Sequence, residues 1–181
     1  MVHAGVVFAH NKTLQPLLNA PVSQTAYTAS KPLDIFIYEK AQVGSLQLRI
    51  QFSHMGRWAA VNDTNGDRVL ILASSFEDPG SHSCTLKALD ETQPSCITNI
   101  INPSQLLHGC IYNVLLSMQD FVGNPVATAM SYEIEHDVRT ETPGFSEPSK
   151  DRIKVAFALQ FTLPENATSG SVKLKIDSWR R

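Results

Sequence analysis

The stretch IYEKAQVGSLQLRI, residues 37–50, occurs a second time near the end of the chain as LPENATSGSVKLKI, residues 163–176. The second half of each stretch alternates apolar and polar residues, which is the pattern of a strand with one buried face. The separation of 126 residues indicates an internal repeat that contains β-strands. Aligned without gaps, the stretches are identical at Glu39/Glu165, Ala41/Ala167, Gly44/Gly170, Ser45/Ser171, Leu48/Leu174 and Ile50/Ile176.

A second, looser match has the same spacing. Residues 9–23, AHNKTLQPLLNAPVS, resemble residues 135–149, EHDVRTETPGFSEPS, when a gap of one residue is allowed. His10 then falls on His136. Proline and serine near Pro21 and Pro148 are typical of linkers between domains.

The two matches together predict that the chain is a window from a longer array. Its parts would be the tail of one repeat in residues 1–23, a complete repeat in residues 24–149 and the first strands of a following repeat in residues 150–181.

The complete repeat is predicted to be all-β. In SLQLRIQFS, residues 45–53, the apolar side chains fall on one face, and CIYNVLLSMQD, residues 110–120, shows the same period of two. We find no convincing helical periodicity. About seven short strands separated by turns predict a sandwich of two sheets.

The pattern L-x-x-G-x-x-Y, formed by Leu106, Gly109 and Tyr112, stands directly before an alternating strand. In sandwich domains such a tyrosine packs inward at the start of a late strand, and its hydroxyl caps a nearby backbone group, the tyrosine corner. The competing interpretation is an ordinary half-buried strand tyrosine. The pattern favours the corner.

These residues together resemble the immunoglobulin-like repeats, of the fibronectin and bacterial Ig-like kind, that occur in tandem in very large extracellular surface and matrix proteins. The chain departs from the pattern at Tyr38, where the second copy has Pro164. The resemblance implies a structural or adhesive role and supplies no active site. It is carried by Glu39, Ala41, Gly44 and Ser45; Ser75, Phe76, Glu77, Gly80 and His82; Leu106, Gly109 and Tyr112; Asp120, Gly123 and Asn124; and residues 137–142.

The three cysteines leave the disulfide pairing open. Cys84 and Cys96 flank a strand, a proline-containing turn and a second strand, so they would face each other across a ladder. The alternatives are a bridge between Cys84 and Cys110, or three buried thiols that pack as small hydrophobic groups. The first pairing is favoured and would stabilise the fold by roughly 2–3 kcal/mol.

Two acidic stretches are weak candidates for calcium. DTNGD offers oxygen atoms from Asp63, Asn65 and Asp67, and DFVGN adds Asp120. A plain turn, in which a carboxylate caps backbone amides, is the favoured interpretation of both stretches. No cofactor and no resident metal are therefore predicted.

Three N-glycosylation sequons begin at Asn11, Asn62 and Asn166, in segments expected to be turns or linkers. They favour a secretory history, and chance occurrence of turn residues is the alternative.

The composition excludes several classes of function. Hydrophobic residues make up 43% of the 181 residues and the net charge is -2, which fits a globular chain without a basic surface for nucleic acid. We find no metal-ligand spacing, nucleophile motif or phosphate-binding loop, and no apolar run of about 18 residues that would span a membrane. An enzyme is not expected.

The prediction is a structural spacer, stalk or fibre-building module of a cell-surface or appendage protein. Its partners would be neighbouring repeats of the same chain or filament. The alternative is an adhesive or lectin-like module that binds surface glycans or matrix proteins through its end loops.

Overall fold

The computed structural model describes residues 11–28, 30–89, 91–147 and 158–175. The chain divides into two compact units, which we call the body (Met1–Val138) and the hairpin unit (Arg139–Arg181). The structure is mostly β, as predicted. Within the described residues the only helical element is a 3₁₀ turn, η1, at Ser74–Phe76.

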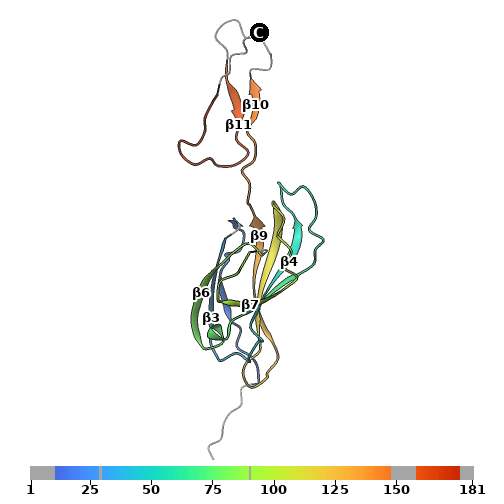
Figure 1. The fold of residues 1–181 in the computed structure, drawn as a ribbon, viewed down its shortest axis with the longest axis vertical. Helices are drawn as coiled ribbons and strands as arrows, with labels where there is room; N and C mark the ends of the chain where they lie inside the picture. The colour runs from blue at the N-terminus through green and yellow to red at the C-terminus, as the bar shows by residue number, and fades with distance from the viewer. Residues whose placement is uncertain (1–10, 29, 90, 148–157, 176–181) are drawn as a thin grey trace, which may run out of the picture. The chain divides into compact units, whose positions relative to one another are not determined.

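The larger sheet of the body has six strands and is strongly curled (Figure 1). Neighbouring strands are antiparallel except for the first pair, β2 and β9, which are parallel. In spatial order the strands are β2 (Ala26–Tyr27), β9 (Ala127–His136), β8 (Cys110–Met118), β4 (Gln47–Met55), β5 (Arg68–Leu72) and β7 (Ile97–Ile101).

The smaller sheet of the body has three antiparallel strands in the order β1 (Leu17–Ala20), β3 (Lys31–Ile37) and β6 (Gly80–Leu86). All seven residues of β3 pair with β6. The chain therefore leaves the smaller sheet after β1 and joins the larger sheet at β2, with a cis peptide bond between Ala20 and Pro21 on the way.

One hydrophobic core joins the two sheets. The apolar residues of the alternating stretch 45–53 are the buried ones: Leu46, Leu48 and Ile50 are at most 3% exposed. The same holds for the inward positions of β8, from Cys110 to Met118. From β3, Leu33, Ile35 and Ile37 belong to the same core cluster and are fully buried. Apolar burial on this scale is the main stabilising contribution to such a fold.

The described part of the hairpin unit contains two antiparallel strands, β10 (Gly144–Glu147) and β11 (Gln160–Thr162). The alternation in VKLKID predicts a further strand. However, residues 171–175 form none, and Val172 and Leu174 are about half exposed, at 49% and 51%. Ile176 and Asp177 lie outside the described residues.

The compact units do not end where the sequence places the repeat boundaries. The division falls after Val138, whereas the sequence analysis placed the second boundary at 149/150. The strand β1, which lies within the predicted tail at 1–23, pairs with β3 of the body. The boundary at 149/150 and residues 150–157 lie outside the described residues, and the division of the chain into repeats stays a prediction.

Candidate functional site

The same strand pairing occurs in both units. In the body, β1 pairs with β3; in the hairpin unit, β10 pairs with β11. Each pairing has one irregularity, at the same step. The partners are Leu17–Phe36, Leu18–Ile35 and Ala20–Asp34 in the body, and Gly144–Thr162, Phe145–Phe161 and Glu147–Gln160 in the hairpin unit.

The registers differ by constant offsets. Each β3 residue lies 126 positions before its β11 counterpart, and each β1 residue lies 127 positions before its β10 counterpart. The difference of one residue is the gap that the looser sequence match required. The hydrogen-bonded pairing of these strands therefore follows the sequence match position by position.

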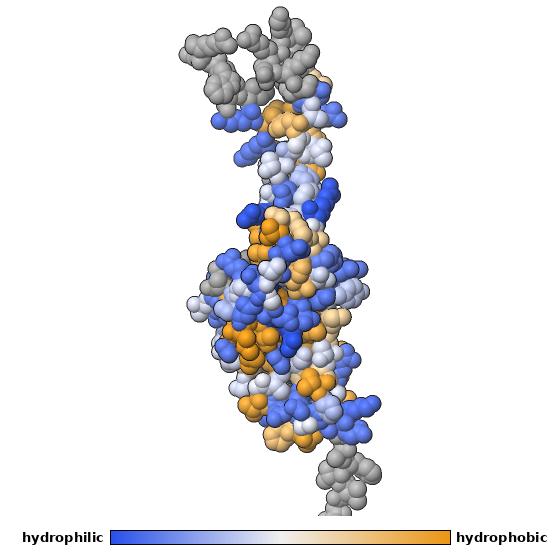
Figure 2. Space-filling view, turned by 90° about the vertical axis from the view of Figure 1, so that its right-hand side faces the viewer, coloured by the Kyte–Doolittle hydropathy of each residue, from blue (hydrophilic) through white to orange (hydrophobic). Residues whose placement is uncertain are grey.

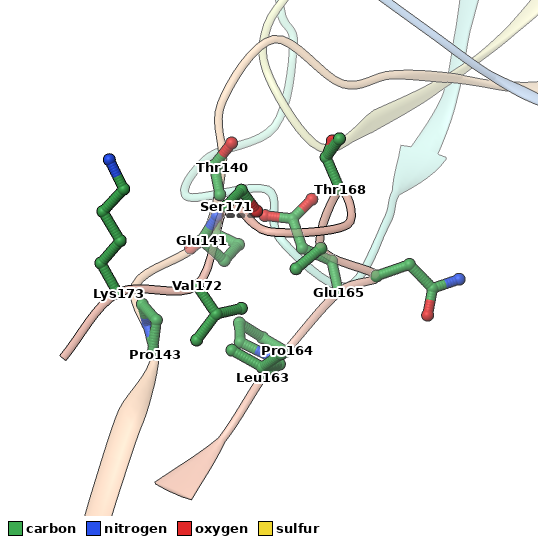
Figure 3. Close-up of a pocket in the computed structure, with 12 residues that line it drawn as sticks. Thr140, Glu141, Pro143, Leu163, Pro164, Glu165, Thr168, Ser171, Val172 and Lys173 are labelled. Atoms are coloured by element: carbon green, nitrogen blue, oxygen red, sulfur yellow. Dashed lines mark hydrogen bonds between the residues drawn. The ribbon is translucent and has the colours of Figure 1, made fainter.

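A glutamate makes the same contact in both units. The Glu39 carboxylate accepts a hydrogen bond from the backbone N–H of Leu14, and the Glu165 carboxylate accepts one from the backbone N–H of Glu141 (Figure 3). The two donors are again 127 positions apart and the two acceptors 126. In each unit the acidic side chain therefore holds the segment that leads into the first strand.

The turn after each glutamate is also shared. Gly44 and Gly170 have φ angles of 73° and 77°, a conformation that strongly favours glycine. The N–H of the following serine, Ser45 or Ser171, donates to the carbonyl oxygen three residues earlier at 2.9 and 3.0 Å. In the body this turn is also anchored to Glu77, whose buried carboxylate accepts from the Gly44 N–H at 2.8 Å.

The chain enters and leaves the body at opposite ends (Figure 1). The buried Thr13 accepts a hydrogen bond from the N–H of Asp120, which follows β8. The chain leaves after His136, at the far end of β9, and a strand of 10 residues spans about 30 Å.

The segment around β2 runs parallel to β9, the last strand of the body. The Gln24 N–H donates to the carbonyl of Tyr132 at 3.0 Å, the Glu135 N–H to that of Thr25 at 2.9 Å, and the Asp137 N–H to that of Tyr27 at 2.9 Å. A force that separates the two ends of the body would load these bonds in shear, so that several would have to break together.

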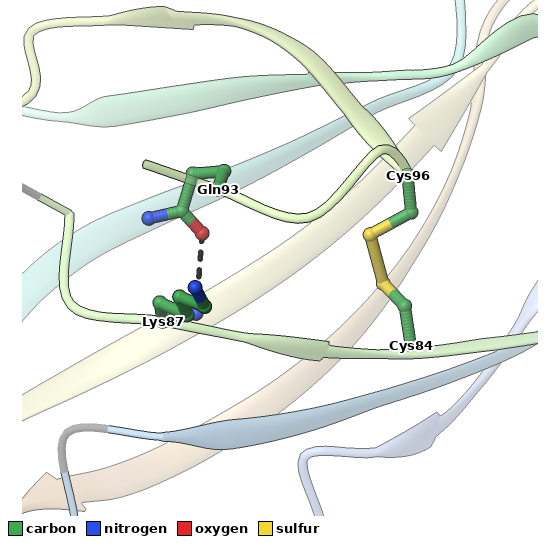
Figure 4. The surroundings of a disulfide bond; sticks show 4 residues. All are labelled: Cys84, Lys87, Gln93 and Cys96. Atoms are coloured by element: carbon green, nitrogen blue, oxygen red, sulfur yellow. Dashed lines mark hydrogen bonds between the residues drawn. A yellow bond between two sulfur atoms is a disulfide. The ribbon is translucent and has the colours of Figure 1, made fainter. Parts of the chain in front are cut away.

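Cys84 and Cys96 form the disulfide, which confirms the favoured pairing (Figure 4). The expected ladder between them is wrong: Cys84 lies on β6 of the smaller sheet, whereas Cys96 directly precedes β7 of the larger sheet, so the bridge links the two sheets. The alternative bridge from Cys84 to Cys110 is not formed. Cys110 is a buried free thiol whose S–H donates to the Val61 carbonyl at 3.5 Å, and burial raises its pKa. The loop that the disulfide closes is held by Gln93, whose side chain accepts from the Lys87 N–H at 3.1 Å and donates to the Ala88 carbonyl at 2.7 Å.

Tyr112 lies at the start of β8 with 1% of its surface exposed. Its hydroxyl accepts a hydrogen bond from the Leu107 N–H at 2.8 Å and donates one to Oδ2 of Asp63 at 2.6 Å. Of the other two residues of the pattern, Leu106 packs against the core, and Gly109 is buried with a φ of 73°. A Cβ on Gly109 would lie 2.3 Å from the backbone nitrogen of Ala59, so the position excludes a side chain.

A buried ion pair, which the sequence analysis missed, completes this cluster. The side chains of Arg68 and Asp63 are fully buried and 2.7 Å apart. The Arg68 guanidinium also donates to the carbonyls of Gly66, Ser104 and Gln105 at 3.0, 3.0 and 2.7 Å. The only signal in the sequence is an arginine at the start of the apolar run RVLILA.

The electrostatics of the cluster fix its charges. Burial alone would raise the pKa of Asp63, but hydrogen bonds from Arg68, Tyr112 and Asn65, together with the Arg68 charge, hold it below its usual value. Burial and the hydrogen bond to Asp63 raise the pKa of Tyr112. The cluster is therefore an ionised, fully hydrogen-bonded structural network.

The calcium candidates are not brought together. Asp63, in the loop between β4 and β5, contacts Tyr112 near the start of β8. Asp120 follows the end of β8 and accepts from the backbone N–H and the side-chain amide of Asn124 at 2.9 and 2.6 Å. Asp67 accepts from Gln51 at 2.8 Å, and Asn65 is exposed. Among residues 11–28, 30–89, 91–147 and 158–175, no group of three acidic, histidine or cysteine side chains could hold a metal ion.

A buried lysine and histidine lie beside a cavity of about 260 Å³ in the body. Lys31 Nζ donates to the Thr28 carbonyl and contacts Nδ1 of His136, both at 2.9 Å. Burial lowers the pKa of Lys31 to about 8, and burial together with the Lys31 charge lowers that of His136 to about 3. His136 is therefore neutral at pH 7, and its Nδ1 can accept a hydrogen bond from Lys31 Nζ.

The three sequon asparagines, Asn11, Asn62 and Asn166, are all exposed. Their side chains are accessible to modification where the protein meets the glycosylation machinery.

The comparisons with known proteins add no relative. No protein-family model, no curated protein sequence and no solved structure matches this chain. In the part of the chain that the structure describes, no helix has the length and apolar character needed to span a membrane.

Proposed function

We propose that the body is an immunoglobulin-like sandwich repeat of an extracellular structural protein, where it acts as a spacer, stalk or fibre-building module. The observation that carries the proposal is the strand pairing that recurs at constant offsets, with the same glutamate contact beside it. A repeated fold with a repeated contact at its start is what a tandem array requires.

The strand order supports the immunoglobulin-like part of the proposal. The order β1-β3-β6 corresponds to strands A, B and E of that fold, and β2-β9-β8-β4-β5 corresponds to the second half of A followed by G, F, C and C′. In this assignment Tyr112 stands at the start of strand F, where a tyrosine corner belongs. The additional edge strand β7 and the curl of the larger sheet are departures from the plain sandwich.

The path of the chain supports the spacer function. The chain enters and leaves the body at opposite ends, and the parallel β2 and β9 place the hydrogen bonds between them across the direction of pull. The disulfide and the exposed sequon asparagines support an extracellular location, because disulfides persist mainly in oxidising compartments.

Single-molecule stretching of the 181-residue chain tests the proposal. We expect the body to resist and then unfold in one step that releases about 40 nm, from about 3.6 Å per residue. The 12-residue separation between the bridged cysteines stays closed in that step, so reduction should add about 4 nm. Gradual lengthening without a resisting step would refute a load-bearing module.

A further inference from the structure

The hairpin unit exposes apolar side chains at positions whose counterparts in the body are buried. Hydrophobic side chains are visible at its surface in Figure 2. At the offset of 126, the pairs and their exposed fractions are Leu159 40% and Leu33 0%, Phe161 40% and Ile35 0%, Leu163 36% and Ile37 0%, Val172 49% and Leu46 0%, and Leu174 51% and Leu48 1%.

These side chains gather in one place. Together with Phe145 they line a depression of about 190 Å³ in the hairpin unit. The rings of Phe145 and Phe161 are 6.3 Å apart between centroids, so the partners across the β10–β11 pair also contact each other. We call this set the open apolar face: Phe145, Leu159, Phe161, Leu163, Val172 and Leu174.

The body shows what covers the equivalent face. There, β6 pairs with β3 along its whole length, and side chains from β5, β8 and β9 complete the core cluster against Leu33, Ile35 and Ile37. In the part of the hairpin unit that the structure describes, β11 pairs only with β10. The edge of β11 that corresponds to the β6 side of β3 therefore has no described strand beside it.

We propose that the open apolar face is half of a hydrophobic core, completed in the same polypeptide by a segment equivalent to residues 56–138 of the body. The segment would add a strand like β6 to the edge of β11 that corresponds to the β6 side of β3, and would cover the face with strands like β5, β8 and β9. This inference rests on the proposed function, because it uses the equivalence of the two units. The alternating apolar residues of the added strands would pack against the open apolar face, as the corresponding strands pack against Leu33, Ile35 and Ile37 in the body.

A direct test is to supply that segment. Arg181 lies 126 positions after Met55, so a copy of residues 56–138 joined after Arg181 would continue the second repeat in register. We expect hydrogen exchange at residues 160–162 to slow by at least 100-fold relative to the 181-residue chain. We also expect the added cysteines to form a second disulfide, counted by mass after thiol alkylation with and without reduction.

The matched control is the same extended chain with Leu159→Asp. Placing a charge in the face should remove both the exchange protection and the second disulfide. In the 181-residue chain, where Leu159 is exposed, it should leave the exchange unchanged.

Three outcomes would overturn the inference. One is unchanged exchange at residues 160–162 in the extended chain, and another is equal protection in the Leu159→Asp control. The third is concentration-dependent dimerisation of the 181-residue chain with protection at these residues, which would make a second copy the occupant. None of them alters the stretching step of the body, so failure here is distinguishable from failure of the proposed function.

Discussion

Two tyrosines of the body offer a matched test of what the buried cluster contributes to stability. The hydroxyls of Tyr112 and Tyr27 each accept a hydrogen bond from the backbone N–H five residues earlier, Leu107 at 2.8 Å and Val22 at 2.9 Å. The contact of Tyr27 is exposed, whereas Tyr112 is buried and also donates to the Asp63 carboxylate at 2.6 Å. The two hydroxyl groups therefore share the backbone contact and differ in burial and in the bond to Asp63.

Tyr112→Phe should lower the free energy of unfolding by about 2–4 kcal/mol, because it removes a hydrogen bond to a charged acceptor and leaves the part-buried N–H of Leu107 without a partner. Tyr27→Phe should cost about 0–1 kcal/mol, because water can replace the lost acceptor. The assay is urea unfolding at pH 7 under oxidising conditions, with an unchanged slope as the sign that only stability has altered. Equal losses in the two variants would refute the reasoning.

The stability difference between wild type and Tyr112→Phe should also depend on pH. The pKa of Asp63 is held below its usual value in the folded state, so its contribution to stability is present above the unfolded pKa of about 4 and is lost as the pH falls through the folded pKa. Removing the Tyr112 hydroxyl weakens that contribution. The stability difference between wild type and Tyr112→Phe should therefore be constant from pH 5 to 8 and shrink below pH 4.

Four further substitutions test other parts of the structure. Cys84→Ser opens the bridge to Cys96 and should lower the free energy of unfolding by roughly 2–3 kcal/mol; an unchanged urea midpoint would contradict a stabilising disulfide. As the pH rises from 8 to 10.5, the free energy of unfolding of the wild type should increase by about 2–3 kcal/mol relative to that of Lys31→Met. In this range the folded protein has released the Lys31 proton, whereas the unfolded chain still binds it. Parallel curves of stability against pH for the two proteins would exclude this effect. Leu33→Ala should lower the free energy of unfolding by about 2–5 kcal/mol in thermal or urea unfolding, because Leu33 is fully buried. The exposed counterpart substitution, Leu159→Ala, should lower it by well under about 1 kcal/mol. Similar losses would show that the two sites are alike.

The sequence by itself determined the local features. Alternation in residues 45–53 set which side chains of β4 are buried, because side chains in a strand point to opposite faces in turn. The positive φ at Gly44 and Gly170 follows from a turn that needs glycine. The Cys84–Cys96 pairing is favoured because its partners flank a short connection, but the expected ladder between them is wrong, since the bridge joins β6 of one sheet to the start of β7 in the other.

Only the tertiary structure decided which distant residues meet. Asp63 and Tyr112 are 49 positions apart, and Lys31 and His136 are 105 apart; neither pair has a sequence pattern that links its members. The change of sheet between β1 and β2 and the curl of the larger sheet likewise have no local signal. Side-chain periodicity reports the environment of one strand, whereas strand order and register depend on how all the strands bury their apolar faces at once.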